Sequence, residues 1–348
     1  MLIGIVGGIL QGMEAVYLCR HAGYTSMVID KRKDAPALSL ADRAEVCDIL
    51  QEPERAKQLF AECDAVIPAV ENLEVLEFLS RTVPECGFPI IVKPSCQSGS
   101  IGVSAVNNEE ERQRALRVIE KLGDSPIQQE FVSGKSVSIE VIGNGKTAKA
   151  YVTTEVVLDS NYDCKQIICE PRVLPEADEE QFIKIGKELG EGLGLNALMD
   201  VEAIFTKKGL RVLEIDARIP SQTPACICAA TGINLLEELV CSKMGKETGK
   251  VPKKGYASYE HFIVRGTTLS TCGEKEFSHV QNPMYLEDFM GADEVITDYR
   301  SGTYECRFTV INHGDSYQDV VHKKKQFITN IMENLELEEF IDKSPDMI

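Results

Sequence analysis

The stretch MDVEAIFTKKGLRVLEIDARIPSQTP, residues 199–224, decides the fold of this chain. Two strand-like runs flank Lys207-Lys208-Gly209, and this pattern predicts a β-hairpin that turns at those three residues. Side chains two residues apart in a strand leave on the same face. Glu214 and Asp216 therefore share a face of the second arm, and Asp200 and Glu202 share a face of the first.

The acidic hairpin predicts a metal site. Alternation brings Glu202, Glu214 and Asp216 within reach of one point when the two arms pair. Converging carboxylates are costly to bury without a cation, and Mg²⁺ suits them because it prefers oxygen ligands, usually a few carboxylates together with phosphate. The alternative is a solvated acidic edge. Apolar neighbours predict that the other face is packed: Val201, Ala203, Ile215 and Ala217.

Composition limits the classes of protein that fit. A chain of 348 residues suits two or three domains. Its net charge of −18 disfavours a partner such as nucleic acid or an anionic membrane, and no apolar run approaches the roughly 20 residues that span a bilayer. The twelve cysteines are scattered without a C-x-x-C pair, and no secretory signal is visible. We therefore expect free thiols in the cytoplasm.

The first 80 residues alternate between strand and helix patterns, which predicts a Rossmann-like parallel sheet. The glycines at the first turn are Gly4, Gly7, Gly8 and Gly12, a spacing that departs from G-x-G-x-x-G. Two interpretations stay open, a tight turn that binds nothing and a ligand site at the crevice. An NAD-dependent oxidoreductase is a weaker alternative, because it leaves the acidic hairpin unexplained.

A second group of signals lies in the middle of the chain. Lys93 ends an apolar strand at 87–94, and the small-residue loop 95–106 follows it. A lysine can bind phosphate as a point charge, and loop N–H groups can donate to phosphate oxygens. Each signal alone fits a surface lysine or a plain loop. Together with the acidic hairpin they indicate nucleoside triphosphate chemistry, without a G-x-x-x-x-G-K-[ST] loop or kinase motifs.

Three segments carry a resemblance to a known fold. IIVKPSCQSGSIGV (90–103), QQEFVSGKSVSIEV (128–141) and the hairpin resemble the ATP-grasp carboxylate–amine ligases. Within them the chain is most similar to the family that joins 3-methyl-D-ornithine to L-lysine in pyrrolysine biosynthesis. The resemblance implies a mixed α/β chain, α+β in its ATP-grasp part. Its expected parts are a Rossmann-like domain at 1–83, a central subdomain at 84–160 and a C-terminal subdomain with a mixed tail at 161–348.

The resemblance also implies roles in binding ATP and metal. Lys93, Ser100 and Ile101 match the clamp on the ATP phosphates. The hinge that reads adenine matches Gln129, Glu130, Phe131 and Val132. Further ATP contacts match Asp30, Asp48 and Ile49. The Mg²⁺ ligands match Glu202, Glu214 and Asp216.

The two small-molecule substrates have counterparts as well. The pocket for the ornithine-like acid matches Ser138, Glu140, Arg218, Ser221, Gln222 and Thr223. The L-lysine site matches Leu10, Gln11, Glu71 and Asn72. Arg218 and Lys93 are the expected catalytic residues, stabilising phosphoryl charge. For Arg218 the alternative is an ion pair with a nearby Asp, and for Glu71 a surface position near a helix N-cap.

The implied activity is formation of an amide through an acyl phosphate, with ADP and phosphate as products. The chain departs from the family between residues 80 and 94, where a segment with a helix and a second ATP-binding lysine has no counterpart. Loss of one charged hydrogen bond costs about 1.5–3 kcal/mol. Three readings follow: another lysine substitutes, the chain is a shortened form, or it binds its ligands without turnover. A ligase for another pair of amino acids also stays open.

Overall fold

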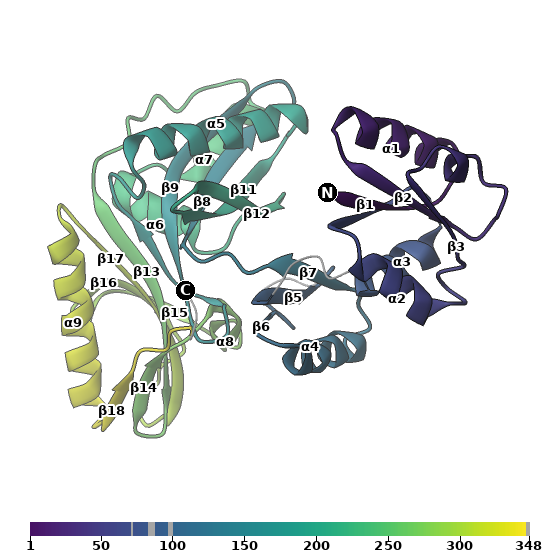
Figure 1. Ribbon diagram of the computed structural model, residues 1–348. Coiled ribbons are helices and arrows are strands. Elements are labelled where there is room, and N and C mark those ends of the chain that lie inside the picture. The colour runs from purple at the N-terminus through teal and green to yellow at the C-terminus, as the bar shows by residue number, and fades with distance from the viewer. Residues whose placement is uncertain (71, 83–87, 97–99, 346–348) are drawn as a thin grey trace. The chain divides into compact units, whose positions relative to one another are not determined.

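The computed structural model describes residues 1–70, 72–82, 88–96 and 100–345 (Figure 1). The chain divides into two compact units. The first comprises residues 1–96 and 105–131, and the second comprises residues 97–104 and 132–348. Each unit is described by itself below.

A parallel sheet opens the first unit, in the strand order β3-β2-β1-β4. Its strands pack Val6, Met27 and Ile29 against Leu59 and Phe60 of a covering helix. The expected Rossmann-like start is confirmed by this order and by the parallel pairing. The elements are β1 (Leu2–Val6), α1 (Leu10–His21), β2 (Thr25–Asp30), η1 (Pro36–Ser39), β3 (Arg43–Val46), α2 (Pro53–Ala61), β4 (Ala65–Pro68) and α3 (Leu73–Thr82).

Close packing accounts for the glycines of the first turn. Gly7 has φ +112°, and a Cβ there would lie 2.6 Å from the carbonyl oxygen of Ala69. A Cβ on Gly12 would lie 2.2 Å from the carbonyl oxygen of Gly7. The backbone N–H of Gly8 donates to Asp30 at 2.6 Å. Tight approach of backbones therefore explains this spacing without a ligand.

A three-stranded sheet, β6-β5-β7, completes the first unit. Ile90 and Val92 of its central strand pack against Ala115 and Ile119 of one helix. Asn108 begins that helix, because its side chain accepts a hydrogen bond from Glu111 N–H. The elements are β5 (Ile90–Pro94), β6 (Ser104–Val106), α4 (Glu109–Lys121) and β7 (Pro126–Glu130).

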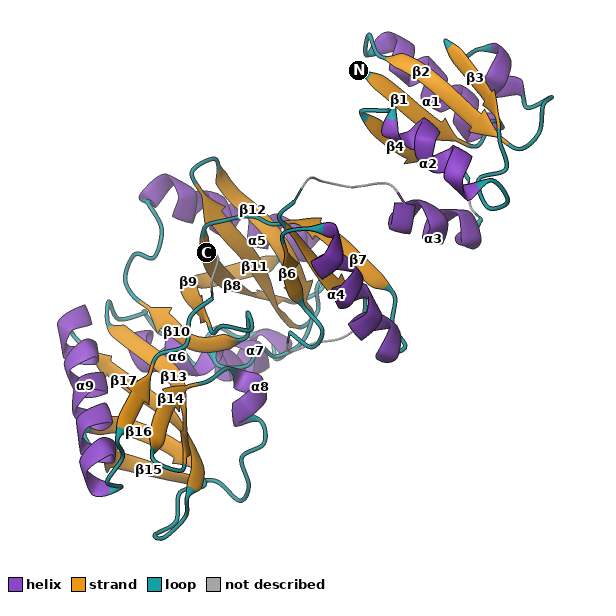
Figure 2. Cartoon of the chain, turned by 60° about the horizontal axis from the view of Figure 1, so that its bottom comes forward, coloured by secondary structure: helices purple, strands orange, loops and turns teal. Residues whose placement is uncertain are grey.

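An eleven-stranded sheet forms the second unit (Figure 2). The main path is β12-β11-β8-β9-β10-β13-β17-β16-β15, and β14 with β18 extends from β13. The strands are β8 (Lys135–Gly143), β9 (Ala148–Leu158), β10 (Cys164–Cys169), β11 (Leu198–Thr206), β12 (Gly209–Asp216), β13 (Tyr256–Arg265), β14 (Thr268–Thr271), β15 (Met284–Phe289), β16 (Ala292–Thr297), β17 (Glu305–Gly314) and β18 (Glu339–Ile341).

Helices pack on this sheet, and each group of helices covers its own cluster of buried apolar side chains. Phe182 of α5 packs on Val137, Val201 and Ala203, which lie on one face of β8 and β11. Ile142 and other residues of the opposite face pack under α6, and α9 covers β13, β16 and β17. The helices are α5 (Glu176–Gly192), α6 (Thr223–Thr231), α7 (Leu235–Lys243), α8 (Glu274–Phe277) and α9 (Tyr317–Asn334).

The C-terminal segment is fixed to the sheet by a buried lysine. Lys165 on β10 is 3% exposed, and its Nζ donates to Asp342 at 2.6 Å, to the carbonyl of Lys343 and to Ser344 Oγ. Thr271 on β14 bonds both Asp342 and the N–H of Lys343. The mixed tail expected from the sequence is therefore packed onto the fold.

The predicted hairpin is confirmed, since β11 and β12 pair around Lys207-Lys208. The prediction that the apolar face of the hairpin is packed holds for β11 but is wrong for β12. Val201 and Ala203 are buried, but Ile215 is 37% exposed and Ala217 is exposed. The reason is that β12 lies at the end of the sheet order, where the cover is thinner.

Among the described residues, no single helix is both long and apolar enough to cross a membrane. The α6–α7 pair, bent by 97°, passes the same test of length and composition when the two helices are joined.

Candidate functional site

Acidic and polar side chains form two rows across three neighbouring strands. In the first row Glu214 of β12, Glu202 of β11 and Ser138 of β8 lie directly opposite one another. In the second row Asp216, Asp200 and Glu140 do the same. A β-bulge between Glu202 and Ala203 separates both rows from the turn end of the hairpin. The structure therefore brings together the predicted metal ligands and part of the predicted acid pocket.

The rows occupy the face that α5 does not cover. Val137 and Val201 point to α5, so their neighbours Ser138 and Glu202 point the other way. The inner members of the rows are deeply buried: Glu140 is 0% exposed, Asp200 4% and Ser138 1%. Both side-chain oxygens of Glu140, Oδ1 of Asp200 and Oγ of Ser138 lack a hydrogen-bond partner in the described residues. This is the pattern of a site rather than of a packing core.

Burial and mutual repulsion raise the pKa values of these carboxyl groups. Burial, followed by repulsion from Glu214 and Asp200, raises the pKa of Glu202 to about 8. Burial, followed by the charge of Asp216, raises the pKa of Asp200 to about 7. Burial raises the pKa of Glu140 to about 8, although the nearby Thr223 hydroxyl favours its ionised form. A cation bound on this face would stabilise the ionised form of these carboxyl groups.

The donor set fits Mg²⁺ in chemistry. Glu202 and Glu214 offer oxygen ligands from directly opposed positions, and Asp216 lies on the same face two residues beyond Glu214. Nevertheless, within the described ranges no three His, Cys, Asp or Glu side chains stand close enough to hold a metal ion as they are. Asp216 is paired with a neighbouring cation instead, so metal binding at Asp216 would compete with that ion pair.

That cation is Arg218. Its Nη2 donates to Asp216 at 2.6 Å, and the two side chains are 50% and 37% exposed. The ion pair with a nearby Asp, the alternative considered for Arg218 from the sequence, is therefore present. Both residues still border the acidic rows, since Asp216 belongs to the second row.

The predicted run Ser221-Gln222-Thr223 forms the start of α6. Gln222 precedes the helix with φ +63°, and Thr223 is 4% exposed. Ser221 Oγ and Gln222 Nε2 both donate to Glu274 on α8, the latter at 2.9 Å. Glu274 also raises the pKa of Glu202 by repulsion. It therefore belongs to the electrostatics of this site, although the sequence did not single it out.

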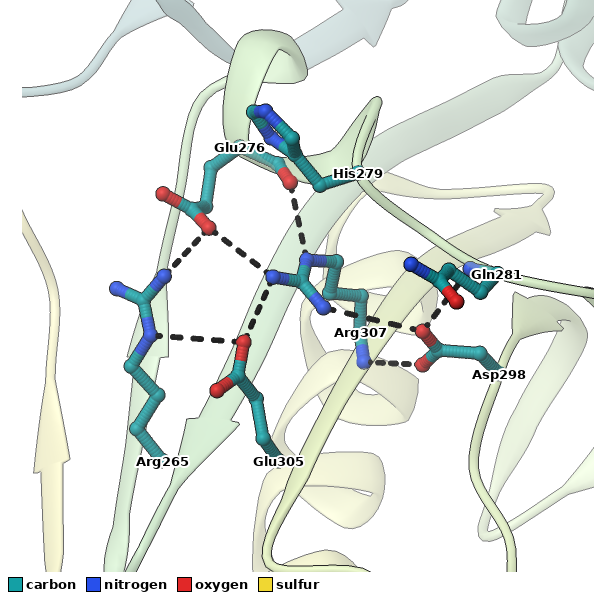
Figure 3. Close-up of a pocket in the computed structure, with 7 residues that line it drawn as sticks. All are labelled: Arg265, Glu276, His279, Gln281, Asp298, Glu305 and Arg307. Carbon is teal, nitrogen blue, oxygen red and sulfur yellow. Dashed lines mark hydrogen bonds and ion pairs between the residues drawn. The ribbon is translucent and has the colours of Figure 1, made fainter.

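An ion-pair network holds α8 in place (Figure 3). It lines a polar cavity of about 570 Å³ in the second unit. Arg307 donates to the Glu276 carbonyl at 3.0 Å and to Glu305 at 2.7 Å, and Arg265 donates to Glu276 at 2.5 Å. Because Glu276 and Glu274 belong to the same four-residue helix, this network also fixes Glu274.

Two of the predicted ATP-binding residues share one sheet face in the first unit. Ile91 lies opposite Gln129 in the β5–β7 pair, and Lys93 is two residues along the same strand. The side chains of Lys93 and Gln129 therefore leave on the face opposite Ile90 and Val92, which pack on α4. Gln129 Oε1 is buried without a partner in the described residues. Glu130 ends β7 and Phe131 follows it, the N–H of Phe131 donating to Pro89.

The other predicted phosphate and hinge residues belong to the second unit. Ser100 has φ +54°, and its Oγ donates to the carbonyl of Tyr162 at 2.9 Å. Ile101 and Val132 are half-buried. Residues 97–99, which the sequence placed in the same phosphate loop, lie outside the described residues.

The remaining predictions fall in the first unit. Asp30 is 8% exposed and bonds Gly8 and Arg32, and the Arg32 interactions and the Gly8 hydrogen bond lower its pKa against the effect of burial. Asp48 is half-buried, and Ile49 belongs to the core. Leu10 and Gln11 are exposed at the start of α1. Asn72 begins α3, accepting from Val75 N–H at 3.1 Å, and Glu71 lies outside the described residues.

Sequence reasoning missed two acidic residues of the site. Asp200 was seen on the hairpin but received no role, although it lies between Asp216 and Glu140. The alternation that selected Glu202 also selects Asp200, so this signal was available. Glu274 lies 72 positions beyond Glu202 in the sequence, and no local pattern indicates that the two approach each other.

Comparisons with known proteins agree with this architecture. A sequence profile of the ATP-grasp domain matches residues 58–222. The chain is 33% identical to a 3-methyl-D-ornithine–L-lysine ligase of Methanosarcina barkeri over 300 residues, covering 75% of this chain and 79% of the relative. Because 75% of 348 residues is fewer than 300, part of the matched region of the relative has no counterpart here.

Solved structures show the same fold. The biotin carboxylase domain of a Hydrogenobacter thermophilus 2-oxoglutarate carboxylase, solved with MgADP and bicarbonate, has a TM-score of 0.55 at 14% identity and covers 94% of this chain and 89% of its own. An N5-carboxyaminoimidazole ribonucleotide synthetase, solved with ADP, has a TM-score of 0.53 at 17% identity, with coverage of 96% and 97%. At these identities the likeness concerns the fold alone.

Proposed function

The chain belongs to the ATP-grasp family of 3-methyl-D-ornithine–L-lysine ligases, and from this premise we propose that it joins the carboxylate of 3-methyl-D-ornithine to the ε-amine of L-lysine. ATP is the co-substrate and Mg²⁺ the metal, and the reaction belongs to pyrrolysine biosynthesis. We further propose the cytoplasm as its location. The observation that carries the proposal is the pair of acidic rows across β12, β11 and β8.

The site residues are assigned within this proposal. Glu202, Glu214 and Asp216 would hold Mg²⁺, which would supply positive charge against the triphosphate. Lys93 binds a phosphate oxygen, and Gln129, on the same face of the β5–β7 sheet, forms a hydrogen bond with the adenine. The remaining assignments keep the residues that the family resemblance indicates: Ser100, Ile101, Glu130, Phe131, Val132, Asp30, Asp48 and Ile49 for ATP, and Leu10, Gln11, Glu71 and Asn72 for L-lysine.

The reaction has two steps. A carboxylate oxygen of the acid attacks the γ-phosphorus of ATP, which forms an acyl phosphate and releases ADP. The ε-amine of L-lysine then attacks the acyl carbon, phosphate leaves, and the amine loses a proton. The protein contributes mostly position and charge, because no covalent bond to the enzyme forms. Arg218 stabilises charge on the transferred phosphoryl group, and Ser138 with the segment Ser221–Thr223 orients the acid.

A direct test is incubation with ATP, Mg²⁺, L-lysine and 3-methyl-D-ornithine or D-ornithine, with the amide product detected by mass spectrometry. Glu214→Gln should lower turnover by about 100-fold or more while the fold is kept. Glu287→Gln, which changes an exposed glutamate on β15, is the matched control. Unchanged turnover in the Glu214 variant would refute the metal assignment.

One observation favours a second candidate function. The relative carries residues without a counterpart in this chain. The connection between residues 80 and 94 is short at the point where the family resemblance places a segment with a second ATP-binding lysine. Residues 83–87 of this connection lie outside the described residues. A protein that binds ATP and amino acids without turnover would explain this difference. Calorimetric binding of MgATP without any product in the mass spectrum would favour that candidate.

A further inference from the structure

A carboxylate from the C-terminal part of the chain holds the segment Ser221-Gln222. Ser221 Oγ donates a hydrogen bond to Oε2 of Glu274, and Gln222 Nε2 donates to the same oxygen at 2.9 Å. Glu274 is the first residue of α8 and lies 52 positions from Gln222 in the sequence. The ATP-grasp profile matches residues up to 222. Glu274 therefore reaches the candidate site from beyond the region that this profile describes.

The backbone of Gln222 has a conformation that needs support. Its φ of +63° and ψ of −56° lie outside the regions that a residue with a Cβ favours, and such a conformation persists when its surroundings hold it. The side-chain amide is bound on both sides, since Nε2 donates to Glu274 and Oε1 accepts from Cys164 Sγ at 3.4 Å. The carbonyl of Gln222 accepts from the N–H groups of Ala225 and Cys226, in the first turn of α6. Gln222 thus links α8 to the start of α6.

The short helix α8 is itself fixed at both ends, so that Glu274 has a defined place. The N–H of Lys275 donates to Asp163 Oδ2 at 2.9 Å. Further along the helix, the carbonyl of Glu276 accepts from Arg307 Nε at 3.0 Å, and the Glu276 carboxylate accepts from Nη2 of the same arginine at 3.3 Å. A shift of Glu274 away from its two partners would break these contacts.

Glu274 lies near the acidic rows, but its hydrogen bonds go elsewhere. Burial and the carboxylates of the hairpin raise the pKa of Glu202 most, and Glu274 adds a smaller repulsion. The hydrogen bonds that Glu274 accepts come from Ser221 and Gln222. Its contacts and its charge therefore act on different parts of the site, and a variant that keeps one without the other separates them.

We propose that Glu274 is a positioning residue, which holds Ser221 and Gln222 in the conformation in which this segment orients the acid substrate. Glu274 does not touch the substrate and acts through the two side chains that it binds. The inference rests on the proposed function, because that function assigns the acid to the segment Ser221–Thr223. It adds a contribution of the C-terminal part of the chain to the site.

Two variants separate hydrogen bonding from charge. Glu274→Gln removes the charge but keeps a carbonyl oxygen, whose two lone pairs can accept both hydrogen bonds. Glu274→Ala removes the charge and the acceptor together. Calorimetry on the full-length protein with Mg²⁺ and a non-hydrolysable ATP analogue measures the affinity for D-ornithine. Glu274→Ala should lower this affinity by about 10-fold and Glu274→Gln by less than about threefold, while both keep the affinity for the analogue within about twofold.

Hydrogen–deuterium exchange measures the positioning without any turnover. Peptides that cover residues 219–228 contain the amides of Ala225 and Cys226, which are bonded to the Gln222 carbonyl. Glu274→Ala should speed their exchange by about fivefold or more, because the first turn of α6 then opens more easily. Glu274→Gln should exchange at nearly the wild-type rate.

A matched control changes a glutamate of the same unit that is remote from α6. Glu287→Ala, which replaces an exposed residue on β15, should alter neither the exchange of these amides nor the affinity for D-ornithine. Circular dichroism melts of all three variants separate loss of the fold from loss of positioning.

Three results would overturn the inference. Unchanged exchange in Glu274→Ala would show that the segment keeps its conformation without this carboxylate. Faster exchange with unchanged affinity for D-ornithine would show that the segment does not orient the acid. A Glu274→Gln variant as impaired as Glu274→Ala would assign the effect to charge. Failure of the proposed function looks different, because the wild-type protein would then form no amide while exchange at the start of α6 still depended on Glu274.

Discussion

Arg218 donates a hydrogen bond to Asp216 at 2.6 Å, so one of the carboxylates assigned to the metal is already paired with a cation two residues away. The same arginine is the group expected to stabilise phosphoryl charge. If Asp216 binds the metal as proposed, loading of the metal and release of Arg218 are coupled through this one carboxylate. A metal ion bound to Asp216 would then free the Arg218 guanidinium to turn to the substrate.

Replacing Arg218 should strengthen Mg²⁺ binding and, at the same time, lower turnover. Arg218→Ala frees Asp216, so the Mg²⁺ concentration for half-maximal activity should fall by about two- to fivefold, the small effect expected for an exposed ion pair. Turnover should fall by about 100-fold because phosphoryl charge loses a partner. Initial rates over a Mg²⁺ titration measure both. Arg211→Ala, which changes an exposed arginine on β12, is the control, and unchanged turnover in Arg218→Ala would contradict the role.

The acidic rows predict how the stability of the metal-free protein depends on pH. The pKa values of Glu202 and Glu140 are about 8 in the folded protein, against about 4.3 for an unfolded glutamate. Between these values the folded state binds more protons than the unfolded state, so stability falls as pH rises from about 4.5 to about 8. Above about pH 8 this contribution levels off, since both states are then ionised.

Glu202→Gln isolates that contribution. The variant should melt at a higher temperature than wild type near pH 8 without metal, gaining up to about 1 kcal/mol because opposed like charges are removed. Its melting temperature should depend less on pH between 5 and 8, and Mg²⁺ with ADP should stabilise it less. Thermal melts over that range test this. Parallel pH profiles for the variant and wild type would show that Glu202 does not titrate as described.

Replacing Lys93 should weaken the binding of ATP more than the binding of L-lysine. Lys93→Ala should raise the KM for ATP by about 10- to 100-fold, because a charged hydrogen bond to phosphate is worth about 1.5–3 kcal/mol. The KM for L-lysine should change little. Lys121→Ala, at the end of α4 in the same unit, is a suitable control. An equal rise in both Michaelis constants would indicate a disturbed fold rather than a lost phosphate contact.

The buried ion pair of the C-terminal segment predicts an asymmetry between two variants. Asp342→Ala leaves the Lys165 ammonium buried with only two neutral acceptors and should lower the free energy of unfolding by about 2 kcal/mol. Lys165→Met removes the buried charge itself and leaves a half-exposed carboxylate, so its cost should be smaller. Urea unfolding measures both. A larger loss in Lys165→Met would show that the amine stabilises more than its partner does.

Local patterns predicted much of the fold. Alternation over residues 199–216 identified the hairpin, its turn and the shared face of the carboxylates, because a strand has a period of two residues. Strand and helix patterns also gave the parallel sheet at the N-terminus. By contrast β10 was not singled out, since Cys164–Cys169 is short and gains its place only by pairing with β9 and β13.

The site was less accessible to sequence reasoning. Glu274 reaches it through a long connection, and its partners Ser221 and Gln222 are 53 and 52 positions away in the sequence. The Asp216–Arg218 pair was foreseen as an alternative only, because spacing cannot decide which neighbour a carboxylate selects. Burial of Glu140 likewise depends on how α6 lies over the sheet, which no local pattern specifies.

β12 carries Glu214 and Asp216 yet pairs along only one of its sides in the sheet order, with β11. Backbone amides on its outer side therefore exchange with solvent deuterium without first breaking a ladder bond, while those facing β11 are protected. A cation bound by carboxylates of both β11 and β12 would stabilise the pairing of this edge strand. If the proposed metal site is correct, the bound ion would link β12 to β11 and protect an edge strand of the sheet from opening.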